Sequence, residues 1–361
     1  MVFGDTNESA AEQVYKANPT AAFQKCDVTN YSEIYNLFKQ AHDKHGRVDH
    51  AISCAGIFEQ GNWFDPELTI DSVKDDPGNT KVLDVNVMGT LHFARIAAVF
   101  LREGRQASEN KSLTLLSSVN AFRDSPGLYL YQTSKHAIQG ILRSTRKTLF
   151  ERDGIRVNAV CPGVTDTQMT THIIQAFKNA NLFWQPADAV AEVILGILIS
   201  DQMNGKAFYV EGGDGYEFED SLYTTQPQWL GEEATKRLRT NSEAVQKVCL
   251  APMFLSVREA DTYTGCIATE VEQQATVAHR PSAWFPSVFA DRAASRHENV
   301  LPPHFCRIAK AYNSKVRVRL NKRGCPPPRR SRLALLAYLA RCSLMTTPFI
   351  YGTSRGIDCC I

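Results

Sequence analysis

Tyr131 and Lys135 are the residues whose types and spacing point most directly to chemistry. They lie four positions apart in "YQTSK", so on a helix they share one face. A phenol has an unperturbed pKa of about 10, and it needs a nearby cation to act as an acid or base at neutral pH. An ammonium group one helical turn away supplies that charge. Ser118 ends the apolar run "SLTLLSS", ahead of Tyr131.

Strand and helix patterns alternate along residues 1–215, with short loops between them. Strand-like apolar runs include "VDHAISCAG", "SLTLLSS", "IRVNAVCPG" and "GKAFYVEGG". Helical patterns separate them, as in residues 127–152 and in "ADAVAEVILGILIS". This alternation predicts a parallel sheet covered by helices on both faces, which is a doubly wound α/β fold. In such a fold the carboxyl ends of the strands bring functional groups to one edge of the sheet.

The composition is that of an ordinary globular protein. The chain has 361 residues, of which 43% are hydrophobic and 22% charged, so it can bury one large core or two modest ones. It contains no unbroken run of about 18 apolar residues, which predicts no transmembrane helix. No secretion-signal pattern occurs at the start, so we predict a cytoplasmic location.

Residues 248–361 differ in composition from residues 1–247. From position 249 onward lie seven of the 10 cysteines, and 16 Lys and Arg residues outnumber 7 Asp and Glu residues. Proline pairs and arginine clusters occur there without a sustained period. We therefore predict one α/β domain over 1–247 and an irregular basic tail over 248–361. The tail could bind nucleic acid or an anionic membrane, or it could be translated intron or out-of-frame DNA. The sequence favours the second interpretation, so we expect no nucleic-acid partner.

Taken together, the motifs resemble the short-chain dehydrogenase/reductase family. The resemblance runs from the first residues to about Lys247 and follows the family's order and spacing. It implies a Rossmann-like fold and transfer of hydride between NAD(P)(H) and a secondary alcohol or ketone. "QPADAV" and "GKAFYVEGG" are similar to NAD-dependent alcohol or hydroxyprostaglandin dehydrogenases. The motifs that carry the resemblance are "DVT" (27–29), "CAG" (54–56), "VNVMG" (85–89), Ser118, "YQTSK" (131–135) and "CPGVTDT" (161–167).

The resemblance implies a catalytic role for four residues. Tyr131 would be the general acid or base, and Ser118 would hold the substrate oxygen. Lys135 would bind the nicotinamide ribose and lower the pKa of Tyr131. Asn86 would anchor a water molecule that links Lys135 to solvent, although an asparagine in a helix is often only a solvated or back-bonding amide.

The resemblance also implies a set of cofactor-binding residues. Asp5 would bind the ribose hydroxyls of the adenosine, which favours NAD over NADP as the cofactor. Asp27 would meet the adenine, or it is only a turn residue. Besides Asn86, Tyr131 and Lys135, the remaining expected contacts are Ala55 and Gly56 on the adenosine side and Val164, Thr165 and Thr167 at the nicotinamide end. No cysteine and histidine spacing is typical of zinc, so we predict no metal site.

The opening "VFGDTN" is similar to the end of the family's second strand. A first strand, a glycine-rich turn and a helix, together roughly 30 residues, are expected ahead of it. We therefore expect that the chain lacks this first β-α unit and its pyrophosphate-binding turn. "FIYGTSRGIDCC" near the C-terminus matches the turn in part, through Gly352 and Gly356. The sequence favours coincidence over a permuted unit, so a catalytically impaired remnant or a binding module stays an alternative function.

The segment "MTTHIIQAFKNANLFWQ" follows the last site motif and is apolar. In the family it gates the substrate, so Phe177, Leu182, Phe183 and Trp184 favour a hydrophobic alcohol of lipid, terpenoid or polyketide type. Alternatively these side chains only pack the segment onto the core. A complete domain of this kind would form a homo-oligomer.

Overall fold

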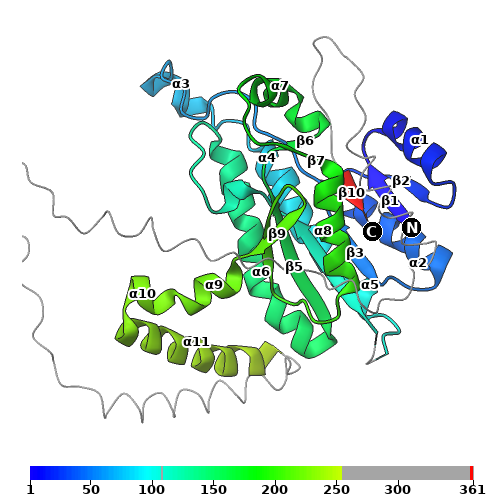
Figure 1. Cartoon of the computed structure of the whole chain (residues 1–361), viewed down its shortest axis with the longest axis vertical. Helices are drawn as coiled ribbons and strands as arrows, with labels where there is room; N and C mark the ends of the chain where they lie inside the picture. Colours follow the sequence, from blue (N-terminus) through cyan, green and yellow to red (C-terminus); the bar gives the residue numbers. More distant parts are fainter. Residues whose placement is uncertain (107–108, 254–357, 361) are drawn as a thin grey trace, which may run out of the picture. The chain divides into compact units, whose positions relative to one another are not determined.

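An eight-stranded, mostly parallel sheet forms the centre of the protein (Figure 1). The computed structural model describes residues 1–106, 109–253 and 358–360. The strand order is β2-β1-β10-β3-β4-β5-β8-β9, and the short strands β6 and β7 form a separate parallel pair. The strands are β1 (Val2–Asp5), β2 (Ala22–Lys25), β3 (His50–Ser53), β4 (Lys111–Leu116), β5 (Ile155–Pro162), β6 (Thr165–Asp166), β7 (Gln185–Pro186), β8 (Ala207–Glu211), β9 (Asp214–Glu217) and β10 (Asp358–Cys360).

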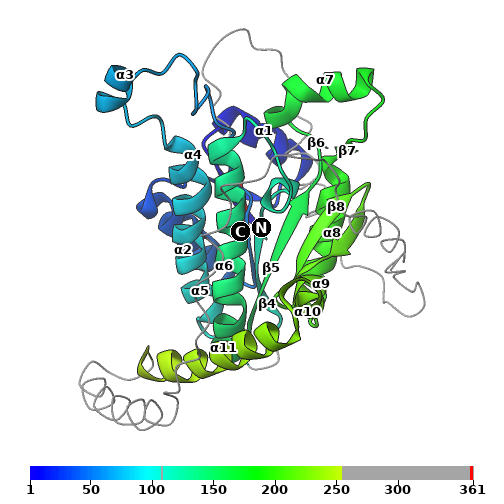
Figure 2. The same ribbon diagram turned by 90° about the vertical axis from the view of Figure 1, so that its left-hand side faces the viewer.

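Helices cover both faces of the sheet, as Figure 2 shows for α2, α5 and α6 on one side and α8 on the other. The side chains of α1 (Glu8–Ala17) and α8 (Ala187–Ile199) pack in one buried cluster. Those of α2 (Tyr31–His45), α5 (Thr90–Arg102) and α6 (Tyr129–Asp153) pack in the other. The predicted doubly wound α/β fold is confirmed. The remaining helices are α3 (Ile70–Asp75), α4 (Lys81–Leu83), α7 (Thr171–Asn179), α9 (Glu219–Thr224), α10 (Gln226–Leu230) and α11 (Glu232–Met253).

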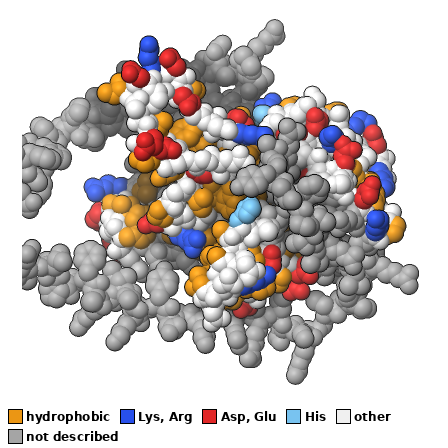
Figure 3. Space-filling model, turned by 90° about the horizontal axis from the view of Figure 1, so that it is seen from above, with side chains coloured by type: hydrophobic (Ala, Val, Ile, Leu, Met, Phe, Trp, Pro, Cys, Tyr) orange, Lys and Arg blue, Asp and Glu red, His pale blue; other side chains and the backbone are white. Residues whose placement is uncertain are grey.

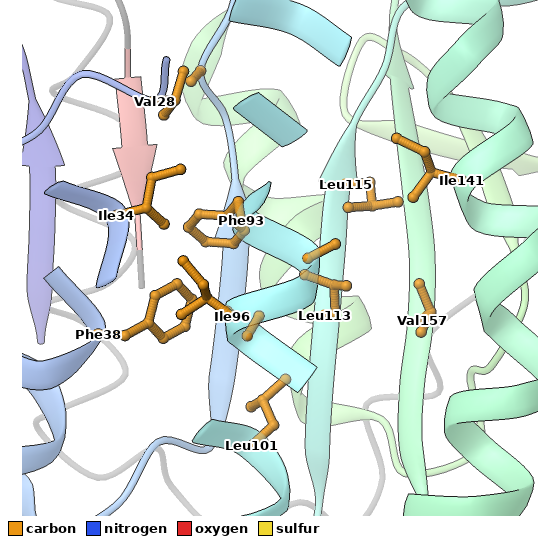
Figure 4. Close-up of a cluster of buried hydrophobic side chains, with 14 of the residues drawn as sticks. Val28, Ile34, Phe38, Phe93, Ile96, Leu101, Leu113, Leu115, Ile141 and Val157 are labelled. Carbon is orange, nitrogen blue, oxygen red and sulfur yellow. The ribbon is translucent and has the colours of Figure 1, made fainter. Parts of the chain in front are cut away.

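The central strands are apolar because both of their faces are buried. In β5, Val157 and Ala159 belong to the cluster under α2, α5 and α6, whereas Val160 belongs to the cluster under α8. Figure 4 shows the first cluster, where the rings of Phe38 on α2 and Phe93 on α5 meet with centroids 4.9 Å apart. This packing on two faces is the physical reason why the strands read as continuous apolar runs.

β10 lies inside the sheet, between β1 and β3, and runs antiparallel to both. Its register places Cys360 opposite Phe3 on one side and opposite Ile52 on the other. In the usual order of a doubly wound sheet this place belongs to the first strand. β1 is therefore an internal strand, and three residues of the tail that we predicted as irregular are regular. Gly352 and Gly356 lie outside the described residues.

The described chain divides into two compact units. One contains the residues up to Tyr223 together with β10, and the other begins at Thr224. In the second unit, Arg239 Nε on α11 donates to Gln226 Oε1 on α10 over 3.1 Å. The predicted domain boundary after residue 247 falls within α11 and stays a prediction.

One helical stretch, Lys81–Arg102, is long and apolar enough to cross a membrane by length and composition alone. It comprises α4, a π-helical segment (Asp84–Gly89) and α5. Half of its most apolar window is buried inside the protein, and Phe93, Ile96 and Leu101 belong to the core. Packing against the sheet is therefore sufficient to explain its apolar character.

His50 makes the stability of the sheet depend on pH. Its ring Nδ1 lies 2.9 Å from Ser112 Oγ on the neighbouring strand β4. Burial lowers the pKa of His50 to about 4, opposed by Asp49 and reinforced by Arg156 and Lys111. The folded chain thus favours the neutral ring, whereas the unfolded chain binds a proton below a pH of about 6.5. The contribution of His50 to the free energy of unfolding should therefore be greatest above that pH. It should fall by up to about 3 kcal/mol as the pH drops towards 4.

Urea unfolding midpoints measured between a pH of about 4.5 and 7.5 test this expectation. His50→Asn keeps a polar group beside Ser112 but does not titrate in this range, so its midpoint should vary less with pH. The same pH dependence in both proteins would show that other groups cause it.

Candidate active site

The predicted site residues follow the carboxyl ends of five strands. Asp5 ends β1 and Asp27 follows β2, whereas Cys54 to Gly56 follow β3. Ser118 lies two residues after β4, and Val164 lies two residues after β5. Because all five of these strands run parallel, their carboxyl ends lie along one edge of the sheet.

Tyr131 and Lys135 lie on the first two turns of α6, and both are buried. Tyr131 forms a hydrogen bond with Ser118, which itself begins a 3-10 turn and accepts from the backbone N–H of Asn120 over 3.2 Å. Lys135 Nζ lies 5.4 Å from the centroid of the Tyr131 ring and donates to the backbone oxygen of Leu116 over 3.2 Å. The structure thus brings together the three side chains that the sequence singled out first.

The charges at this cluster differ from the expectation. Burial raises the pKa of Tyr131 to about 12, although its hydrogen bond with Ser118 lowers it. Burial also lowers the pKa of Lys135 to about 8, against the thiols of Cys161 and Cys54, which raise it. We expected Lys135 to lower the pKa of Tyr131 below about 10, whereas burial raises it. Both groups are removed from water, and desolvation favours the neutral form of each.

Asn86 lies on the π-helical segment and is buried. Its Oδ1 accepts from the backbone N–H of Ile57 over 2.8 Å. Its Nδ2 donates to the backbone oxygen of Ile57 over 3.0 Å and to Ser134 Oγ over 2.9 Å. Its own backbone oxygen accepts from Thr90 Oγ1 over 2.8 Å. The side-chain amide therefore joins the loop after β3 to α6, and it is neither a solvated nor a back-bonding amide.

The two aspartates that we predicted to bind the adenosine organise turns. Asp5 Oδ1 accepts from the backbone N–H of Asn7 over 2.8 Å. Asp27 Oδ1 accepts from both the backbone N–H and the hydroxyl of Thr29, over 2.9 and 2.7 Å. The turn role that the sequence left open for Asp27 is therefore present. A contact with adenine stays a prediction for this residue.

Ala55 and Gly56 belong to the loop after β3, and Gly56 lies beside Asn86 and Lys135. Ala55 is buried, and a Cβ atom built on Gly56 would lie 3.4 Å from both Asn86 Oδ1 and Lys135 Nζ. A larger side chain at position 56 would crowd the ammonium group. A small residue at position 56 therefore leaves room for the ammonium group beside this loop.

Val164, Thr165 and Thr167 belong to the loop after β5. The backbone oxygen of Val164 accepts from Gln185 N over 3.0 Å, and β6 pairs with β7. Thr165 Oγ1 donates to the backbone oxygen of Gly163 over 3.0 Å. Thr167 caps the 3-10 turn before α7 through Thr170. These contacts hold the loop beside the strand end, and the expected contacts with nicotinamide stay predictions.

Glu59 is a residue of this site that the sequence did not single out. Its carboxylate accepts from the backbone N–H groups of Tyr129 and Tyr131 over 2.9 and 2.7 Å. The preceding Phe58 lies against the Tyr131 ring, with centroids 4.3 Å apart. One signal in the sequence could have indicated such a residue. The segment "SPGLY" at the start of α6 offers no capping side chain next to Tyr129, so an acceptor must come from elsewhere.

The described residues contain no group of three or more His, Cys, Asp or Glu side chains placed to hold a metal ion. This observation covers only the described part of the chain, and the absence of a metal site stays a prediction. The cluster consists of a phenol, a hydroxyl, an amide and an ammonium group, which suits proton transfer and hydrogen bonding to a polar ligand.

Comparison with known proteins identifies the chain. The family model for short chain dehydrogenase matches residues 1–177. Short-chain dehydrogenase reductase 3c of Arabidopsis thaliana is 31% identical over 209 residues, which cover 54% of this chain and 75% of that protein. The chain belongs to the short-chain dehydrogenase/reductase family. The resemblance read from the sequence is thereby confirmed, and a general role as an oxidoreductase follows from it.

Two further matches place this dehydrogenase/reductase among its relatives. Short-chain dehydrogenase/reductase ascJ of Acremonium egyptiacum is 29% identical over 205 residues, which cover 56% of this chain and 67% of that protein. A crystal structure of 3-oxoacyl-[acyl-carrier protein] reductase from Brucella melitensis in complex with NAD has a TM-score of 0.50 and 22% identity. The match covers 59% of this chain and 85% of the reductase chain. At 22% identity this similarity shows the shared fold alone.

Proposed function

We propose that the protein transfers hydride between NAD(H) and a secondary alcohol or ketone that is largely apolar. The observation that carries this proposal is the buried cluster of Ser118, Tyr131 and Lys135 beside the carboxyl end of β4. The Brucella relative that shares the fold binds NAD. Family membership gives the reaction class, and the cluster supplies the groups that such a reaction needs from the protein.

The residues present fit the nicotinamide half of the cofactor. Lys135 Nζ has one hydrogen-bond acceptor among the described residues, Leu116, so further N–H bonds are free for the ribose hydroxyls. On the adenosine side, the buried hydroxyl Oγ1 of Thr6, directly after Asp5, has no partner in the described part of the chain. Asp5 places a carboxylate at the end of β1, and a carboxylate there accepts ribose hydroxyls and repels a 2′-phosphate. NAD is therefore preferred over NADP.

A nicotinamide held at Lys135 would supply or accept the hydride, and the protein's own residues move the proton. The Tyr131 hydroxyl donates its proton to the carbonyl oxygen during reduction and takes it back during oxidation. With a pKa raised by burial to about 12, Tyr131 is protonated at neutral pH and ready as a donor. The Ser118 hydroxyl holds the same substrate oxygen. Alcohol oxidation needs the phenolate, which the positive charge of Lys135 near the Tyr131 ring stabilises.

The substrate class follows from the segment around α7. Ile174 is the buried residue of this helix, whereas Leu182 and Phe183 are about half exposed. The exposure of Leu182 and Phe183 supports a role for them beyond packing onto the core. Seen from the end of the molecule that carries α3 and α7, hydrophobic side chains gather near the centre of the surface (Figure 3). We therefore assign an apolar alcohol of lipid, terpenoid or polyketide type.

A second candidate function is a binding module with impaired catalysis. β10 occupies the place where a doubly wound sheet has its first strand, and it is antiparallel to β1. Its carboxyl end therefore faces the edge of the sheet opposite to Ser118. This observation favours weak binding of the pyrophosphate.

The experiment that tests these candidates is a panel of secondary alcohols with NAD⁺, monitored by NADH absorbance. The panel pairs cyclic and long-chain apolar alcohols with sugars and polyols of similar size. We expect turnover of the apolar members, and preference for the polar members would contradict the substrate class. If no alcohol is turned over and NADH fluorescence does not change on addition of the protein, the binding-module candidate replaces the enzyme.

A further inference from the structure

The first turn of α6 carries Tyr131 but has no cap of its own. The residue at the cap position is Leu128, whose side chain makes no capping hydrogen bond. The first four N–H groups of a helix have no partner within the helix, and a buried N–H without a partner is costly. The helix start beside the catalytic cluster therefore needs an acceptor from another part of the chain.

Glu59 supplies that acceptor with both of its carboxylate oxygens. Oε1 accepts from Tyr129 N over 2.9 Å, and Oε2 accepts from Tyr131 N over 2.7 Å. An anionic acceptor at a helix N-terminus is also favoured by the helix dipole. A cap normally comes from the residue before the helix, but this one comes from the loop after β3 that also contains Ala55 and Gly56.

The same loop holds the Tyr131 turn at two further points. The Phe58 ring packs on the Tyr131 ring at 4.3 Å between centroids, with 53° between their planes. The Ile57 backbone is bonded to the Asn86 amide, which donates to Ser134 Oγ, and Ser134 Oγ donates to the backbone oxygen of Tyr131 over 2.7 Å. Both peptide groups that flank Tyr131 are therefore tied to residues 57–59.

We propose that Glu59 is a positioning residue that fixes the Tyr131 phenol relative to the loop of Ala55 and Gly56. The proposal rests on the proposed function, because it assigns Glu59 to the proton-transfer geometry of that site. A displacement of about 1 Å at a reacting group can cost about 10²-fold in rate. Two charge-assisted hydrogen bonds to one turn provide the restraint that prevents such a displacement.

The test compares Glu59→Ala and Glu59→Gln with Glu67→Gln, which alters an exposed glutamate on the same segment. Glutamine keeps one carbonyl oxygen as an acceptor, so the effects should be graded, with alanine the larger. We expect Tyr129 and Tyr131 amides to exchange hydrogen at least about 10-fold faster in Glu59→Ala, while amides in the middle of α6 keep their protection. Glu67→Gln should leave both unchanged.

Kinetics with NAD⁺ and the best alcohol of the panel separate positioning from simple stabilisation. Glu59→Ala should lower kcat by about 10-fold or more with little change in KM, and Glu59→Gln should recover part of the loss. A purely structural cap would lower the melting temperature and leave the kcat of the folded protein unchanged, and that result would overturn the proposal. If Glu59→Ala does not fold, the Glu59→Gln values decide.

The two proposals fail in different ways. If the unmodified protein turns over no alcohol, the proposed function fails, and amide exchange still shows whether Glu59 holds the turn. If the protein is active and kcat is the same in Glu59→Ala, only the positioning role of Glu59 fails. Unchanged exchange at Tyr129 and Tyr131 would contradict the restraint itself.

Discussion

Replacement of Tyr131 by phenylalanine is expected to reduce alcohol turnover by about 10²- to 10⁴-fold, the usual contribution of general acid–base catalysis. The substitution removes the hydroxyl that exchanges a proton with the substrate oxygen, and it keeps the ring that packs against Phe58. Folding and NADH binding should therefore persist. Steady-state rates over the alcohol panel, with NADH fluorescence titrations beside them, measure the two effects separately.

The matched control is Tyr129→Phe. Tyr129 lies on the same turn of α6, but its ring packs edge-on against Phe64, with centroids 4.8 Å apart. Its hydroxyl has no place in the proposed proton transfer, so turnover should stay within about 2-fold of the unmodified protein. If folded Tyr131→Phe keeps near-normal turnover, the phenol is not the proton-transfer group, and the family resemblance describes the fold without the mechanism.

The sequence was sufficient to predict that Ser118, Tyr131 and Lys135 lie together, because local rules determine their placement. Tyr131 and Lys135 share a helix face by spacing alone, and Ser118 lies at the carboxyl end of a strand whose apolar run is unmistakable. A parallel sheet then brings the strand end and the helix start together. None of these steps requires knowledge of contacts between distant segments.

The features that the sequence did not predict depend on such distant contacts. Glu59 meets Tyr131 across 72 positions of the chain, and the amino-acid sequence around Glu59 looks like any polar loop. β10 pairs with β1 from the opposite end of the chain. A strand of three residues carries too little periodic signal to stand out in a tail rich in Pro, Arg and Cys.

The predicted pKa of Tyr131 differs from the structure for another reason. The prediction from the Tyr-x-x-x-Lys spacing took account only of the attraction between phenolate and ammonium. In the structure both groups are buried, and their removal from water raises the pKa of Tyr131 and lowers that of Lys135. Burial therefore favours the neutral form of both the phenol and the amine.

Replacement of Lys135 by methionine should weaken NADH binding by about 10-fold and lower turnover by about 10²-fold. Methionine keeps the apolar stem of this buried side chain but removes the ammonium group that donates to Leu116 and, in our proposal, to the ribose. Turnover should suffer more than binding because Lys135 also supplies positive charge to the phenolate. NADH titrations and rates over the alcohol panel give the two values, and Lys147→Met, an exposed lysine further along α6, is the control.

The pH dependence of NADH binding shows whether the charge of Lys135 contributes to the affinity or only the shape of its side chain. Burial lowers the pKa of Lys135 to about 8, so the ammonium form prevails below that pH and the neutral amine above it. Hydrogen bonds from a charged donor are roughly twice as strong as neutral ones. The affinity of the unmodified protein for NADH should therefore decline as the pH rises through about 8, whereas that of Lys135→Met should stay nearly level. Equal slopes for both proteins would mean that another group titrates, and that Lys135 holds the cofactor without using its charge.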